Sequence, residues 1–123
     1  MEERGRRRRG GGFWRQWNVA VILLLLKEKP SHGYELADRL AEFNLGRKGI
    51  GQMGGLYRLL SFLEEQKYID SSWETNESGP AKKIYKTNDN GLEYLKAVSK
   101  EMEIIKSKIS MFQKRAKQIE ENF

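Results

Sequence analysis

The sequence predicts a mainly α-helical fold that carries one small β-hairpin and ends in a long helix. Three observations predict it. Apolar segments of helical length, separated by connections that contain proline or glycine, fill residues 14–66. Two short runs of β-favouring residues then flank a turn-like segment at 75–81. Apolar residues finally recur every three or four positions up to the end of the chain, which is typical of a heptad repeat.

Composition limits the class of protein. The 123 residues are enough for one domain, and the net charge of +6 favours a polyanionic partner. The chain has no cysteine, which excludes a disulfide framework and a thiolate metal site. The apolar run at 19–26 is much shorter than the roughly 20 residues that cross a bilayer. A secretory signal is the rival interpretation, because arginines precede this run, but two tryptophans intervene and no small-residue cleavage site follows. We therefore expect a cytoplasmic protein without membrane contact.

The N-terminal segment differs in composition from the helix that follows it. Residues 1–12 are mainly arginine and glycine and have no apolar side chain after Met1, so we expect a disordered basic arm. Such an arm either enters a minor groove or remains a solvated tail that raises general affinity for nucleic acid. Residues 14–28 are predicted to form a first helix that is apolar nearly all round over 19–26, so that it lies centrally. Pro30 ends this helix.

Two further helices follow. Ser31 is predicted to cap a second helix over 31–43. The next connection contains three glycines and two basic residues, Arg47 and Lys48. A third helix is predicted at about 53–66. Its apolar face consists of Leu56, Leu59, Leu60 and Leu63. Its opposite face consists of Gly54, Arg58, Ser61 and Glu65.

A β-hairpin completes the first part of the chain. Residues 68–74 and 82–86 are predicted strands, and the returning strand is basic. The order helix, helix, turn, helix, hairpin is that of a winged helix-turn-helix, which we assign to residues 13–88.

The last helix is predicted over about 89–121, with Asn88 as its N-cap. Its apolar positions form a regular seam of alternating steps of three and four: Leu95, Val98, Met102, Ile105, Ile109, Phe112, Ala116 and Ile119. A helix of this length extends about 50 Å, more than the rest of the domain can cover. A second copy of the chain is the natural partner for this seam, so residues 89–123 are predicted to form a dimerisation helix that pairs as a coiled coil.

The N-terminus of the third helix is the predicted docking point for duplex DNA. Gly54 and Gly55 have no side chains, so backbone N–H groups there can approach a phosphate closely. Arg58 and Ser61 follow on the exposed face, whereas Glu65 at the far end would repel phosphates. The alternative is that the two glycines only allow tight packing against the second helix.

Several motifs together resemble the PadR family of phenolic-acid-repressor-like transcription regulators. They lie between about residues 18 and 95 and read PSHGYEL at 30–36, GGLYRLL at 54–60, LEE at 63–65, YI at 68–69, WE at 73–74, GP at 79–80, KIY at 83–85 and Gly91. The single long helix at the end resembles the shorter subfamily, which dimerises through it. The resemblance implies a homodimer on an inverted-repeat operator, with repression that a small molecule relieves in many members.

The resemblance also assigns individual residues. Tyr57 and Arg58 would contact the DNA backbone or bases, while Lys82 and Lys83 on the hairpin would reach an adjacent phosphate. The sequence departs from the family pattern in three places. The family usually has Thr where Gly55 stands, Arg near Lys82, and Thr at the cap of the last helix.

A ligand site is a further implication of the resemblance. Some relatives bind flat aromatic compounds between aromatic side chains at the dimer interface. The matching candidates here are Trp14, Trp17, Met102 and Phe112. The alternative is that these four side chains serve only in core or interface packing.

Catalysis is not predicted. His32 is the only histidine, and the sequence suggests neither a nucleophile nor an orienting partner for it. The sequence also predicts no metal site and no cofactor. The competing function is a winged-helix adaptor for protein interactions, without a small-molecule effector, whose last helix binds a different chain.

Overall fold

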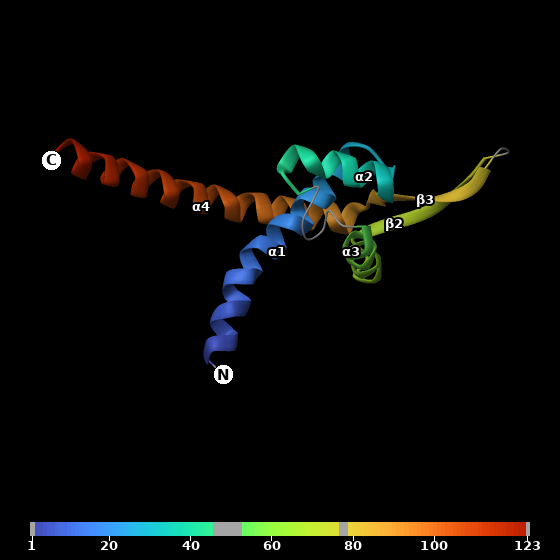
Figure 1. Cartoon of the computed structure of the whole chain (residues 1–123), viewed down its shortest axis with the longest axis horizontal. Coiled ribbons are helices and arrows are strands. Elements are labelled where there is room, and N and C mark those ends of the chain that lie inside the picture. Colours follow the sequence, from blue (N-terminus) through green and yellow to red (C-terminus); the bar gives the residue numbers. More distant parts are fainter. Residues whose placement is uncertain (1, 46–52, 77–78, 123) are drawn as a thin grey trace.

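The computed structural model describes residues 2–45, 53–76 and 79–122, with side chains from Gly12 onward. In chain order the elements are α1 (Glu2–Glu28), β1 (Ser31–His32), α2 (Gly33–Leu40), the 3₁₀ turn η1 (Ala41–Phe43), α3 (Met53–Glu65), β2 (Ile69–Asn76), β3 (Gly79–Thr87) and α4 (Asp89–Glu121) (Figure 1). The predicted fold class is confirmed, because helices dominate and the strands form one small antiparallel sheet.

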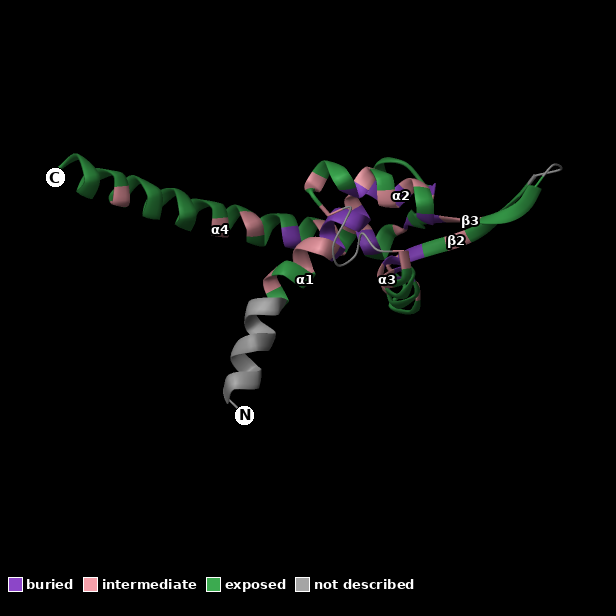
Figure 2. Cartoon of the chain, in the orientation of Figure 1, coloured by how far each residue is buried: buried purple, intermediate pink, exposed green. Residues whose placement is uncertain are grey.

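The core lies where α1, α2, α3 and the base of the sheet meet. In α1 the residues Ile22, Leu23, Leu25 and Leu26 are almost fully buried, so this helix is central, as its all-round apolar sequence predicts. The purple segments in Figure 2 gather at this meeting point, while the outer parts of α4 and of the hairpin are exposed.

Helix α1 runs from Glu2 to Glu28, and its side chains are described from Gly12 onward. The expected disordered basic arm at residues 1–12 lies, apart from Gly12, outside the residues whose side chains are described, and it stays a prediction.

The sheet has one strand more than predicted. Its order is β1–β3–β2, and all pairs are antiparallel. The two-residue strand β1 pairs Ser31 with Tyr85 and His32 with Ile84. Strands β2 and β3 form the hairpin, here called the wing.

The N-cap of the second helix is His32, whereas the sequence predicted Ser31. The His32 Nδ1 atom accepts a hydrogen bond from the Glu35 backbone N–H at 3.4 Å. Ser31 is buried, and its hydroxyl donates to the Lys29 carbonyl at 3.1 Å and accepts from Arg39 at 2.8 Å. The serine hydroxyl therefore joins α2 to the end of α1 and is not used as a cap.

The C-terminal part of helix α4 extends away from the domain (Figure 1). Its predicted N-cap is confirmed, because the Asn88 side chain accepts from the Gly91 N–H at 3.0 Å. Among its described residues only Gly91 and Val98 are buried. The outer turns are therefore mostly exposed among the described residues.

Candidate nucleic-acid interface

Helix α3 presents the two faces that the sequence predicts. Leu56, Leu60 and Leu63 are fully buried and Leu59 is half-buried. The opposite face is exposed along its whole length and consists of Gly54, Arg58, Ser61 and Glu65. A cationic and a hydroxyl side chain on one open helix face are groups that can donate hydrogen bonds to phosphate or to base edges.

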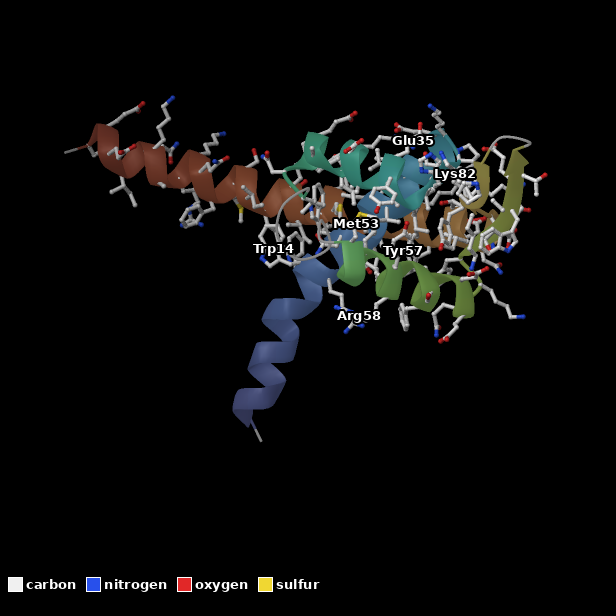
Figure 3. The ribbon with its side chains drawn as sticks, turned by 45° about the vertical axis from the view of Figure 1, so that its right-hand side comes forward. Trp14, Glu35, Met53, Tyr57, Arg58 and Lys82 are labelled. Carbon is white, nitrogen blue, oxygen red and sulfur yellow. The ribbon has the colours of Figure 1, made fainter. Side chains whose placement is uncertain are left out.

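Arg58 lies at the open side of this face. Its Nη1 atom is 3.7 Å from the place where a Cβ at Gly54 would be, so the guanidinium passes over the first turn of the helix. Figure 3 shows Arg58 pointing away from the body of the domain. Tyr57 is the preceding residue of the same helix.

Tyr57 is held by close contact with α2. A Cβ at Gly33 would lie 2.5 Å from the Tyr57 hydroxyl oxygen and 2.6 Å from its ring, so a side chain there would displace the phenol. Tyr57 nevertheless remains 39% exposed. Glycine at the first residue of α2 thus leaves room for this exposed phenol.

The wing contributes two lysines that lie in different surroundings. Lys82 is exposed and stands opposite Glu74 in the sheet register. Lys83 is half-buried, and its Nζ lies 3.3 Å from Oε1 of Glu64 on α3. The second carboxylate oxygen of Glu64 accepts a hydrogen bond from the Ser71 hydroxyl on β2. The Ser71 hydroxyl, and after it Lys83, hold the pKa of Glu64 below its ordinary value.

Sequence reasoning missed two exposed aromatic side chains near this surface. Trp73 on the wing is 65% exposed and stands opposite Lys83, and Tyr34 in the first turn of α2 is also exposed. Alternation along the strand would have placed Trp73 on the same face as Ser71. The other predicted basic residues, Arg47 and Lys48, lie outside the described residues. Gly55 is half-buried in α3.

The predicted seam on α4 divides into two parts. Val98 is only 3% exposed because it packs within its own chain, and Leu95 and Met102 are half-buried. Farther along, Ile105 and Ala116 are half-buried, whereas Ile109, Phe112 and Ile119 are exposed. The outer seam (Ile105 to Ile119) is therefore an apolar stripe that the described residues leave largely open to solvent.

Comparison with known proteins identifies the family. The family model described as "Transcriptional regulator PadR-like family" matches residues 22–97, which is more than half of the chain. The chain belongs to the PadR-like family of transcriptional regulators. It is therefore a DNA-binding regulator and not an enzyme. No curated protein sequence matches the chain.

Solved structures of similar proteins agree with this PadR-like fold. A conserved protein of unknown function, described as a potential transcriptional factor, is 45% identical with a TM-score of 0.72, over 84% of this chain and 90% of that one. A PadR-like transcription factor from Bacteroides fragilis is 23% identical with a TM-score of 0.70, over 85% and 98%. A PadR family regulator from Clostridium difficile is 25% identical with a TM-score of 0.64, over 76% and 94%.

The candidate ligand residues of this PadR-like regulator are only partly brought together. Trp17 and Met102 line an apolar pocket of about 370 Å³ between α1, η1 and α4, together with Phe43. Trp14 and Phe112 do not line it, and both are largely exposed.

In the described part of the chain, no helix is both long and apolar enough to cross a membrane.

Proposed function

We propose that this PadR-like regulator is a ligand-responsive repressor that binds an inverted-repeat operator as a homodimer in the cytoplasm. The observation that carries the proposal is that two separate surfaces lie on different parts of the chain. A helix-turn-helix presents an open polar face on α3, and α4 extends an uncovered apolar seam away from it. Regulators of this family bind DNA and typically dimerise.

The DNA contacts that we propose come from two elements. On α3 the N-terminal turn with Gly54 and Gly55, the Tyr57 phenol, the Arg58 guanidinium and the Ser61 hydroxyl enter a major groove. On the wing Lys82 reaches an adjacent phosphate, because it is exposed. Arg47 and Lys48, which precede α3 in the sequence and lie outside the described residues, are proposed as further DNA contacts.

Homodimerisation would place two such DNA-binding units on one duplex. Two recognition helices that enter successive major grooves on one side of B-DNA lie about 34 Å apart. The outer seam fixes this distance by pairing with its copy as a coiled coil, whereas Val98 on the inner seam is already buried within its own chain. We propose residues 13–88 as the DNA-binding unit and residues 89–123 as the dimerisation helix.

The effector that we propose is a small flat aromatic compound. The pocket beside Trp17 and Met102 is lined almost entirely by apolar side chains and lies against both α1 and α4. Phe112 and Trp14 are exposed in the single chain and would complete this site from the partner's side. An occupant there contacts the dimerisation helix directly and so changes the spacing of the two DNA-binding units.

Fluorescence anisotropy on the upstream DNA of the protein's own gene, against a scrambled duplex and over a salt series, tests this function. We expect tight binding to the native duplex alone, with an affinity that falls as salt rises. Arg58→Glu is expected to abolish this binding without unfolding the protein. Lys114→Glu makes the same change of charge on the exposed outer part of α4 and is the matched control.

Two results would contradict the proposal. Unchanged operator affinity in Arg58→Glu would show that α3 does not dock in this way. Equal weak binding to both duplexes, combined with a monomeric protein in sedimentation, would favour an adaptor whose α4 binds a different chain.

A further inference from the structure

Three side chains from three elements meet between the recognition helix and the wing. They are Glu64 near the end of α3, Ser71 on β2 and Lys83 on β3, and we call them the clamp. The Lys83 Nζ lies 3.3 Å from Glu64 Oε1, and the Ser71 hydroxyl donates to Glu64 Oε2. Both carboxylate oxygens of Glu64 are therefore bound by the wing.

The sheet register explains why these side chains converge. Ser71 pairs with Tyr85, and Lys83 is two residues before Tyr85 on the same strand, so all three side chains lie on one face of the wing. Tyr85 is buried, which shows that this face is turned toward the body of the domain. The Lys83 ammonium also lies 5.5 Å from the centre of the Tyr85 ring. Lys83 is thus held from two sides.

Lys82 has the opposite orientation. It follows the alternation of the strand to the other face of the wing, and it is exposed. Two adjacent lysines therefore differ in what they offer to a polyanion. The charge of Lys83 is offset by Glu64, whereas Lys82 is exposed and, among the described residues, forms no ion pair with Glu74 opposite it.

We propose that Lys83 is a positioning residue and that it fixes the recognition helix against the wing through Glu64, while Lys82 makes the wing's phosphate contact. This inference rests on the proposed docking of α3 and the wing on one duplex. Glu64 alone would place an unpaired carboxylate beside DNA, where it repels phosphates. The clamp removes this repulsion and at the same time sets the angle between the two DNA-contacting elements.

The test compares salt dependence, because only a phosphate contact changes it. The logarithm of the DNA association constant falls with the logarithm of salt by about 0.9 for each phosphate that the protein neutralises. Lys82→Met is expected to reduce this slope by about 2 for a homodimer, because two wings each lose one contact. Lys83→Met is expected to weaken binding about three- to tenfold, the scale of two lost ion pairs, and to leave the slope unchanged.

Glu64→Gln gives the sharpest distinction. If Lys83 positions α3, the glutamine variant binds more weakly than the wild type, although it has lost a negative charge. The double variant Glu64→Gln with Lys83→Met is then no weaker than the weaker single variant, because both substitutions break the same contact. Lys83→Arg keeps a cation at this position and is expected to restore most of the affinity. Thermal unfolding of each variant confirms that it is folded.

Two patterns would overturn the inference. In one, Lys83→Met lowers the salt slope as much as Lys82→Met and Glu64→Gln tightens binding, which makes Lys83 a phosphate contact. In the other, Lys83→Met and Glu64→Gln leave both affinity and slope unchanged, which makes the clamp irrelevant to DNA. Because phosphate contacts do not depend on sequence, the same slopes can be measured on the scrambled duplex. The role of the clamp can therefore be tested even if equal binding to both duplexes has contradicted the proposed specific regulator.

Discussion

Truncation of one aromatic side chain on α4 tests the dimerisation seam. Phe112 lies on the predicted seam and is 72% exposed in the single chain, so a second copy would cover most of it. Phe112→Ala removes this apolar surface and leaves a good helix former in the same place. Any loss therefore concerns the interface and not the helix itself.

The expected loss follows from the exposed fraction. Full burial of a phenylalanine side chain contributes about 1.5–3 kcal/mol, so covering the exposed part of Phe112 contributes about 1–2 kcal/mol in each protomer. Both protomers lose it, which amounts to about 2–4 kcal/mol for the dimer. Since 1.4 kcal/mol is a factor of ten, the dimer Kd is expected to rise by about 30- to 700-fold.

Sedimentation equilibrium over a concentration series measures this Kd. Met111→Ala is the matched control, because Met111 is the adjacent residue, is 56% exposed and lies off the seam. We expect the control to leave the Kd within a few-fold of the wild-type value. Equal weakening by both substitutions would show that the seam is wrongly placed, and a Kd unchanged in Phe112→Ala would refute pairing through this face.

Three further predictions concern residues 13–88, the proposed DNA-binding unit. Gly33→Ala would place a Cβ 2.5 Å from the Tyr57 hydroxyl oxygen, so the phenol must move, and we expect weaker operator binding in anisotropy but no further loss when Tyr57 is already alanine. Thr87→Val removes a buried hydroxyl that donates to a main-chain carbonyl of α1 at 2.8 Å, and chemical denaturation should show a loss of about 1–3 kcal/mol, against little change for the exposed Thr75→Val. The lowered pKa of Glu64 means that its carboxylate stabilises the fold at pH values above the ordinary 4.5 and that this contribution is lost as pH falls through the lower native pKa. The difference in unfolding free energy between wild type and Glu64→Gln should therefore be present near neutral pH and disappear in acid; a difference that persists there would mean that the carboxylate charge is not its source.

Local signals predicted the parts of the fold that depend on neighbouring residues. Asn88 and the heptad spacing after it predict the start, the cap and the end of α4, because a side-chain cap and a helical period act over a few residues. The faces of α3 were also predictable, since Leu56, Leu60 and Leu63 recur at helical spacing.

Distant partners explain what the sequence could not predict. Strand β1 exists only because Ser31 and His32 pair with β3, more than fifty residues later, and two residues carry no strand signal of their own. Ser31 does not cap α2, because its hydroxyl accepts a hydrogen bond from Arg39. The Arg39 guanidinium also donates to two main-chain carbonyls at the end of α1. The contact of Lys83 with Glu64 likewise joins residues that are 19 positions apart, so no local signal predicts it.

The entry of α4 into the domain determines how the proposed dimerisation helix is joined to the helix-turn-helix. The Asn88 amide donates to the Lys67 carbonyl at 3.0 Å and to Asp70 Oδ1 at 3.1 Å, while its oxygen caps α4. Gly91 packs against the Tyr68 carbonyl so closely that a Cβ has no room there. The first turn of α4 is therefore bound to the segment that directly follows the recognition helix. A change in the direction of α4 must either break these hydrogen bonds or move the end of α3 with it. In the proposed homodimer, the angle at which two copies of α4 cross would therefore be passed on to the two α3 helices.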